Sequence, residues 1–249
     1  MREKTENSWF ICFEKRPQAQ TRLICFAHAG GSASVFATWH KELPSSIELS
    51  AVRMPGRDER RTERARTDFT EALAEMVDGL RNQDTRPVAL FGYSLGALFA
   101  FECARALATA GTPATHLFVA ARRAPQLGVE TMTRGLSDEA FARVMGQRYG
   151  GIPQPILDDP DLLRYFLPII RADIALLESY AYREAPPLPC GITALGGERD
   201  PRVSRDCLQQ WSLHTTAGFE LRQFPGGHFF VTPDQRGAVL RAVAARCTM

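Results

Sequence analysis

A G-x-S-x-G pentapeptide at residues 92–96, centred on Ser94, constrains the fold more than any other feature of the sequence. It follows the short apolar run 88–91 and opens the helical pattern 95–110. In a strand-turn-helix context, this pattern indicates a nucleophile elbow, a turn so tight that small residues must flank the serine. The turn would raise the serine hydroxyl clear of a sheet, beside a helix N-terminus whose dipole favours developing negative charge.

Short apolar runs rich in β-forming residues alternate with longer helical patterns along the chain. The predicted strands are residues 9–13, 23–27, 47–53, 88–92, 117–121, 192–195 and 219–224, and the main predicted helices are 69–81, 95–110, 205–213 and 235–245. This alternation favours a mostly parallel sheet with helices on both faces. Together with the elbow it predicts an α/β-hydrolase fold, with residues 1–249 forming a single domain.

Composition excludes several classes of protein. With a net charge of +2 and 45% hydrophobic residues, the chain matches a globular enzyme and lacks the basic excess expected of a nucleic-acid-binding protein. None of the six cysteines forms a C-x-x-C pair, so no zinc or redox motif is indicated, and we expect no metal and no cofactor. The N-terminus lacks the apolar core of a signal peptide, and no apolar run would cross a membrane. A cytoplasmic protein without membrane contact is expected.

The stretch between residues 121 and 190 interrupts the alternation, because it shows helical patterns without a convincing strand. Residues 136–147 and 161–182 are the predicted helices, and Pro168 is expected to kink or split the second. We interpret residues 125–185 as a mobile helical lid. Its apolar stripe consists of Phe166, Ile170, Ile174 and Leu177, which are expected to line a substrate pocket. The alternative is an ordinary helix pair whose stripe belongs to the core.

A serine hydroxyl needs a base to act as a nucleophile, and the base needs an acid that holds its tautomer. His228 lies in a glycine-bearing loop after the predicted strand 219–224 and before the last helix, where this fold places its base. Asp200 follows the predicted strand 192–195, and the order Ser94, Asp200, His228 is that of α/β-hydrolases. The alternatives are His214 for the base, and Glu198 or Asp206 for the acid.

An oxyanion hole requires two backbone N–H groups. The N–H of Leu95 directly follows the nucleophile and is the first candidate. The second should come from the loop after the predicted strand 23–27, where Ala29 is favoured and Gly30 remains possible. His28 is interpreted as a residue that shapes this loop.

Six segments together resemble the type II thioesterases of polyketide synthase and non-ribosomal peptide synthetase pathways. They are H-A-G-G at 28–31, M-P-G-R at 54–57, the elbow at 92–96, L-S-D-E at 136–139, L-P-I-I-R-A-D at 167–173 and G-G-H-F-F at 226–230. The resemblance covers about residues 23–240. It implies a free-standing editing enzyme that hydrolyses acyl groups from the phosphopantetheine arm of carrier proteins, with the triad acting on the thioester.

Two further readings remain open from the sequence: another hydrolase or acyltransferase of the same fold, such as a carboxylesterase, and a binding module without activity. If a carrier protein is the partner, its acidic helix should meet a basic surface. The arginines available for that surface are Arg53, Arg57, Arg60, Arg61, Arg64 and Arg66, with Arg122 and Arg123 on a second strand end. Acidic residues interleave with the first group, so a solvated surface is the alternative for it.

Overall fold

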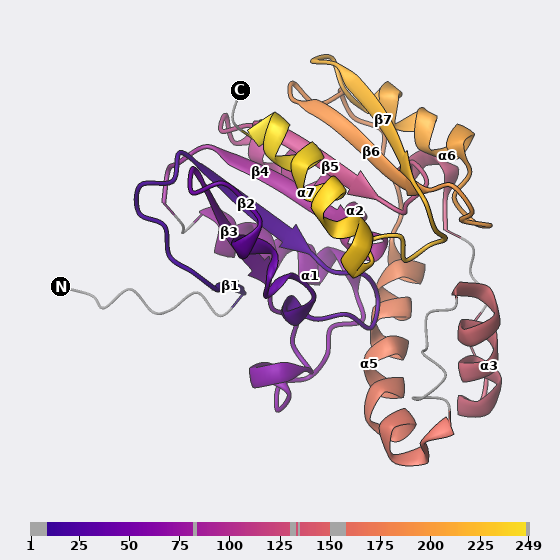
Figure 1. The fold of residues 1–249 in the computed structure, drawn as a ribbon. Helices are drawn as coiled ribbons and strands as arrows, with labels where there is room; N and C mark the ends of the chain where they lie inside the picture. Colours follow the sequence, from indigo (N-terminus) through magenta and orange to yellow (C-terminus); the bar gives the residue numbers. More distant parts are fainter. Residues whose placement is uncertain (1–8, 82–83, 130–132, 134, 150–157, 248–249) are drawn as a thin grey trace.

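The computed structural model describes residues 9–81, 84–129, 133, 135–149 and 158–247 (Figure 1). Its centre is a seven-stranded sheet with the order β1-β3-β2-β4-β5-β6-β7. The β1 strand pairs antiparallel with β3, and the other six strands are parallel. The strands are β1 (Phe10–Cys12), β2 (Thr21–Phe26), β3 (Ile47–Val52), β4 (Val88–Tyr93), β5 (His116–Ala120), β6 (Gly191–Gly197) and β7 (Phe219–Phe224).

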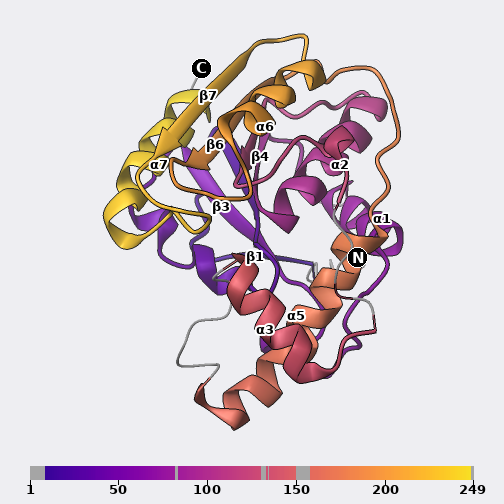
Figure 2. The same cartoon turned by 90° about the vertical axis from the view of Figure 1, so that its right-hand side faces the viewer.

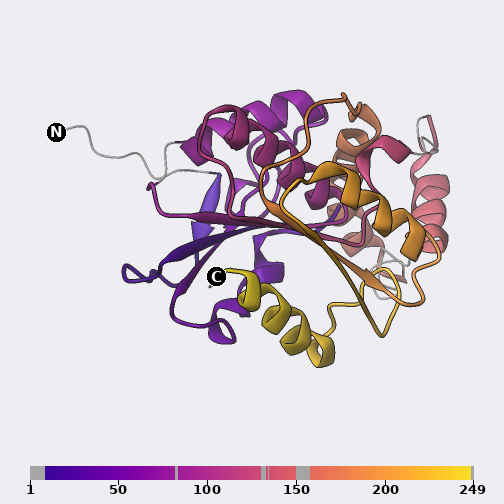
Figure 3. The ribbon, with the colours of Figure 1, turned by 90° about the horizontal axis from the view of Figure 1, so that it is seen from above.

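Helices cover both faces of the sheet (Figure 3). One face carries α1 (Phe69–Arg81), α2 (Leu95–Thr109) and α6 (Arg205–Gln209), and the other carries α7 (Pro233–Cys247). Alternate residues of the central strands enter the two cores, because side chains alternate along a strand. Ile24 and Phe26 of β2 belong to the core under α2, whereas Leu23 and Cys25 belong to the core under α7.

The strand order reverses beside β2, and this reversal locates the functional edge of the sheet. The chain runs from β2 to β3 on one side of β2 and then returns to β4 on its other side. In open parallel sheets, ligands bind at the carboxyl ends of the strands where the order reverses. The loop after β2 and the elbow after β4 therefore meet at the expected place for a site.

Two helices extend from this edge of the sheet, α3 (Asp138–Tyr149) and α5 (Pro160–Ser179) (Figures 1 and 2). Arg171 of α5 holds α3, because its guanidinium donates to Asp138 at 2.8 Å and to the carbonyl of Leu136 at 2.8 Å, and lies over the ring of Phe141. Of the two outcomes expected at Pro168, a split is excluded because α5 continues through this residue. Pro168 is exposed, so water can hydrogen-bond to the carbonyl that the missing N–H leaves free.

The predicted fold class is confirmed: this is an α/β-hydrolase fold, and each of the seven predicted strands is present, with β7 at its predicted bounds and the other six shifted by one or two residues at one or both ends. The predicted helix 205–213 is divided into α6 and the 3₁₀ turn Gln210–His214. Among the described residues, no helix is long and apolar enough to cross a membrane.

Candidate active site

Ser94 lies on the sharp turn between β4 and α2, with a backbone φ of 53° that side-chain-bearing residues rarely adopt. The glycines on either side are required by close backbone packing. A Cβ on Gly92 would lie 2.3 Å from the carbonyl oxygen of Gly96, and a Cβ on Gly96 would lie 2.2 Å from that of Phe26. The geometry is that of a nucleophile elbow, and half-buried Ser94 lines a pocket at the end of the sheet.

Gly96→Ala should therefore destabilise the protein by about 3 kcal/mol, the upper part of the range for overpacking, because backbone atoms cannot yield as a flexible side chain can. Urea unfolding gives the measurement. Gly237→Ala in α7 is the matched control, since its added Cβ would meet only the flexible side-chain ends of Arg241 at 3.4 Å and Glu42 at 3.7 Å. The control should be neutral, or more stable by up to about 1 kcal/mol. Equal effects of the two substitutions would contradict this account of the elbow.

The structure brings the three residues of the predicted triad into one hydrogen-bonded chain. Nε2 of His228 lies 3.1 Å from Oγ of Ser94, and Nδ1 of His228 lies 2.8 Å from Oδ2 of Asp200. His228 and Asp200 are both buried, and the two residues come from the loops after β7 and β6. This arrangement allows His228 to take the Ser94 proton through one ring nitrogen while Asp200 holds the other.

Asp200 is held in its charged form. Burial alone would raise the pKa of its carboxyl group, but the hydrogen bond and charge of His228 and two backbone N–H groups outweigh burial and keep the pKa below its usual value. The backbone donors are Arg202 at 2.9 Å and Val203 at 3.3 Å, both to Oδ1. The carboxylate can therefore stabilise a positive charge that forms on His228.

The alternatives for base and acid lie elsewhere. His214 contacts the side chain of Gln126 at 2.6 Å and packs edge-on against the ring of Phe101 in α2. Glu198 and Asp206 are exposed, whereas Asp200 is the acid that meets His228.

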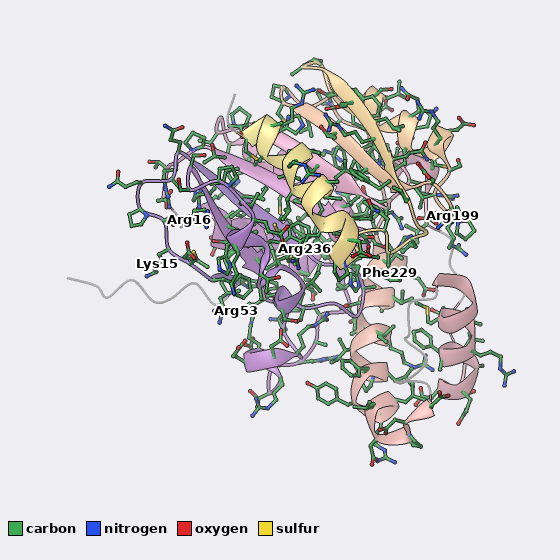
Figure 4. The ribbon with its side chains drawn as sticks, viewed as in Figure 1. Lys15, Arg16, Arg53, Arg199, Phe229 and Arg236 are labelled. Carbon is green, nitrogen blue, oxygen red and sulfur yellow. The ribbon has the colours of Figure 1, made fainter. Side chains whose placement is uncertain are left out.

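Tyr93 and Phe229 support the histidine loop, and the sequence did not indicate either role. The buried hydroxyl of Tyr93 donates to the carbonyl of His228 at 2.6 Å. The ring of Phe229 stacks on Tyr93 and meets the rings of His28 and His228 edge-on. Figure 4 shows Phe229 where the end of the sheet meets α5. Tyr93 lies between Gly92 and Ser94 in the sequence. Its hydrogen-bond partner, the carbonyl of His228, is 135 positions away and could be identified only from the structure.

The backbone around the elbow provides two free N–H groups. Within the described part of the chain, the N–H groups of Ala29 and Leu95 donate to no other protein group. Gly30, the second candidate in the first loop, is already engaged, because its N–H donates to Oδ2 of Asp173 at 2.7 Å. Of the two candidates in this loop, only Ala29 is thus available for a substrate oxygen. Burial lowers the pKa of His28, which disfavours its protonation and agrees with a loop-shaping role.

A pocket is lined by Ser94 and His228 together with apolar residues of the predicted lid segment. Ile170, Ile174 and Leu177 of α5 line it as expected, together with Met145 of α3 and Val129. Phe166 is not among the described residues that line it. The first half of α5 extends away from the sheet (Figure 1), and the Phe166 ring contacts Tyr165 there. Met145 could have been found from its place in the predicted lid helix.

Three arginines also line this pocket: Arg122 and Arg123 after β5, and Arg202 beside Asp200. The first two were expected at the rim from their position at a strand end, whereas Arg202 was not. Half-buried guanidinium groups beside apolar side chains in one pocket suit a ligand that combines a negative group with an acyl chain.

The arginine-rich segment after β3 differs from the expectation of an open basic surface. Arg57 and Arg60 are buried. Arg57 pairs with Asp173, Arg60 pairs with Glu63 and lies over the ring of Trp9, and Arg66 pairs with Glu75. Arg61 and Arg64 are exposed. Three of the six arginines therefore have partners within the fold. Arg53 is half-buried, and a docking role stays a prediction for the exposed Arg61 and Arg64.

In the parts of the chain that the structure describes, no three His, Cys, Asp or Glu side chains gather as they would around a metal ion.

Comparison with known proteins agrees with this geometry. The model of the thioesterase domain family matches residues 21–247. The thioesterase PikA5 of Streptomyces venezuelae is 39% identical over 227 residues, which cover 90% of this chain and 80% of PikA5. The structure of BorB, a type II thioesterase from the borrelidin biosynthetic cluster, is similar with a TM-score of 0.88 and 37% identity, covering 98% of this chain and all of BorB. The RedJ thioesterase of the prodiginine pathway in Streptomyces coelicolor gives a TM-score of 0.86 at 33% identity, covering 93% of this chain and 92% of RedJ. The chain belongs to the thioesterase family, and its resemblance to the type II thioesterases is confirmed.

Proposed function

We propose that this thioester hydrolase acts on acyl groups carried by the phosphopantetheine arm of carrier proteins, and that it edits polyketide or non-ribosomal peptide assembly lines. The observation that carries the proposal is the chain of hydrogen bonds from Ser94 through His228 to Asp200, placed at a pocket with an apolar lid side and a basic rim. The apolar side suits an acyl chain. The rim, with Arg122, Arg123 and Arg202, suits the phosphate of the arm.

The reaction follows from the positions of these groups. Oγ of Ser94 attacks the thioester carbonyl while its proton passes to Nε2 of His228, and the N–H groups of Leu95 and Ala29 stabilise the oxyanion. The C–S bond then breaks, and the leaving thiolate takes the proton from His228. His228 next takes a proton from water, which attacks the Ser94 ester. When this second tetrahedral intermediate collapses, Oγ of Ser94 regains a proton from His228 and the free acid leaves.

The substrate class can be tested by comparing kcat/KM for one acyl group on four carriers: a carrier protein, coenzyme A, N-acetylcysteamine and a simple alcohol. We expect the order to fall from carrier protein to coenzyme A to N-acetylcysteamine, because each step removes a contact that the rim or the surface provides. The oxygen ester should be the poorest substrate. An oxygen ester that is hydrolysed as well as the acyl-carrier protein would favour a carboxylesterase instead. Transfer of the acyl group to an added amine or alcohol in preference to water would indicate an acyltransferase.

Ile174→Ala should move the chain-length preference toward longer acyl groups, because it enlarges the pocket that Ile174 lines. Each methylene buried in the added space contributes about 0.8 kcal/mol, so relative kcat/KM should change up to about fourfold per methylene. Phe166→Ala is the control: Phe166 lies on the same helix and is half-buried, but it is not among the lining residues. The control should lose stability and keep its profile. An unchanged profile in Ile174→Ala would assign Ile174 to the core alone.

The lid role of residues 125–185 and the cytoplasmic location remain predictions. In support of the lid role, α3 and α5 both contribute side chains to the pocket, through Met145 and through Ile170, Ile174 and Leu177.

A further inference from the structure

A buried ion pair joins the helix α5 to the loop that carries Ala29. Oδ2 of Asp173 accepts hydrogen bonds from the N–H of Gly30 and from Nη1 of Arg57, each at 2.7 Å. Nη2 of Arg57 donates to the other carboxylate oxygen, and Nη1 also donates to the carbonyl of Gly31 at 2.7 Å. Asp173 is 1% exposed and Arg57 is 4% exposed. Two distant segments are thus held against one short loop.

Hydrogen bonds also fix the two peptide planes on either side of Ala29. The plane between Ala29 and Gly30 is held at one end by Asp173, through the Gly30 N–H, and at the other by Nδ1 of His28, 3.0 Å from the carbonyl oxygen of Ala29. The peptide plane between His28 and Ala29 is held by the N–H of Gly31, which donates to the carbonyl oxygen of His28 at 2.9 Å. In a trans peptide the N–H points opposite to the carbonyl, so the direction of the Ala29 N–H is set as well.

Packing closes the same loop against the helix. Gly30 has a φ of +77°, and a Cβ added there would lie 3.0 Å from Cγ1 of Ile170. Ile170 and Asp173 are three residues apart and therefore share one face of α5. The helix meets the loop with an apolar contact from Ile170 and a charged contact from Asp173, and Ile170 also lines the acyl pocket.

We propose that Asp173 and Arg57 are positioning residues that aim the Ala29 N–H at the substrate oxyanion and couple its position to the lid helix. Asp173 occupies the Gly30 N–H and leaves that of Ala29 as the donor, and Arg57 fixes the carboxylate in the orientation this requires. An acyl group in the pocket would contact Ile170, which lies on the same face of α5 as Asp173. The inference rests on the proposed function, because it assigns Ala29 to the oxyanion hole.

Two variants test the pair. Asp173→Ala removes the acceptor of the Gly30 N–H and leaves the buried charge of Arg57 without its partner. The double variant Arg57→Met/Asp173→Leu removes the same acceptor but leaves no unpaired charge, and such apolar replacements of buried ion pairs commonly preserve folding. The control is Asp138→Asn, which breaks the exposed pair between Asp138 and Arg171 elsewhere on α5.

The decisive readout is the inhibition constant of an acyl trifluoromethyl ketone, which forms a tetrahedral adduct with the serine and places an oxyanion between the two N–H donors. In the double variant we expect kcat to fall by about 10- to 100-fold with KM little changed, as for a displaced catalytic group. The inhibition constant should rise by a similar factor. A loss of folded protein would lower the amount of active enzyme without changing the inhibition constant, and Asp138→Asn should match the wild type in both.

Wild-type kcat and inhibition constant in the folded double variant would overturn the positioning role, even while Ser94→Ala remained inactive. If Ser94→Ala kept its activity, the proposed function would fail instead. The two failures are therefore distinguishable.

Discussion

Ser94→Ala is expected to lower kcat for thioester hydrolysis by about 10⁴- to 10⁶-fold, the range for loss of a catalytic nucleophile. The hydroxyl is the only group of Ser94 that the chemistry uses, and it faces His228 at 3.1 Å. Alanine keeps a Cβ, so the substitution adds no clash at a turn where φ is already 53°. The free energy of unfolding should therefore remain within about 0.5 kcal/mol of the wild type, as for substitutions that leave packing intact.

The measurement is single-turnover hydrolysis of an acyl-carrier protein at saturating enzyme, which removes any effect of weaker binding. Circular dichroism and urea unfolding of the same preparation show whether the fold is retained. A folded variant with more than about a tenth of wild-type activity would exclude Ser94 as the nucleophile, because residual catalysis without a nucleophile is far smaller.

Asp200→Asn should lower kcat by about 10⁴-fold and leave KM nearly unchanged. The amide of asparagine can present a donor to Nδ1 of His228, which would favour the tautomer with its proton on Nε2. That tautomer cannot accept the proton of Ser94. The neutral amide also removes the negative charge that stabilises the protonated imidazole. Oδ2 of Asp200 contacts His228 and Oδ1 contacts backbone N–H groups, so the carboxylate is not expected to bind the substrate.

Glu198→Gln and Asp206→Asn are the matched controls for Asp200→Asn. Both acids lie within six residues of Asp200, and both are exposed. Each control should keep kcat within about twofold of the wild type, since exposed charges this far from a reacting group contribute little. A larger loss of kcat in either control than in Asp200→Asn would show that the acid has been misassigned.

The elbow and the strands could be predicted from the sequence because the residues that define them are close together in the chain. The glycines at 92 and 96 surround the serine within one turn, and the apolar runs mark the strands because each central strand is buried on both faces. Asp200 and His228 could be selected because each follows a strand, and parallel strands of one sheet end at the same edge. Strand-end placement and chain order together favoured Asp200 and His228 over the alternatives Glu198, Asp206 and His214.

Contacts between distant segments were beyond such reasoning. Arg57 and Asp173 are separated by 116 positions, and each lies in a segment that was noted for its motif without a partner. The contacts of Arg60 with Trp9 and of Arg66 with Glu75 could not be predicted either, because a run of arginines does not show which of them pack against acidic or aromatic side chains. Helical periodicity placed Phe166 on the face of Ile170, but it could not indicate that the first half of α5 extends past the pocket.

The most direct test of the account is to label the enzyme with an alkyl fluorophosphonate and follow labelling and hydrolysis of an acyl-carrier protein in the same samples. Peptide mass spectrometry then identifies the modified residue. We predict one phosphonyl group per chain, on Ser94, with hydrolysis lost in proportion to labelling. A label on another residue, or full hydrolysis by enzyme that is completely labelled on Ser94, would contradict the central claim that Ser94 is the nucleophile of this thioesterase.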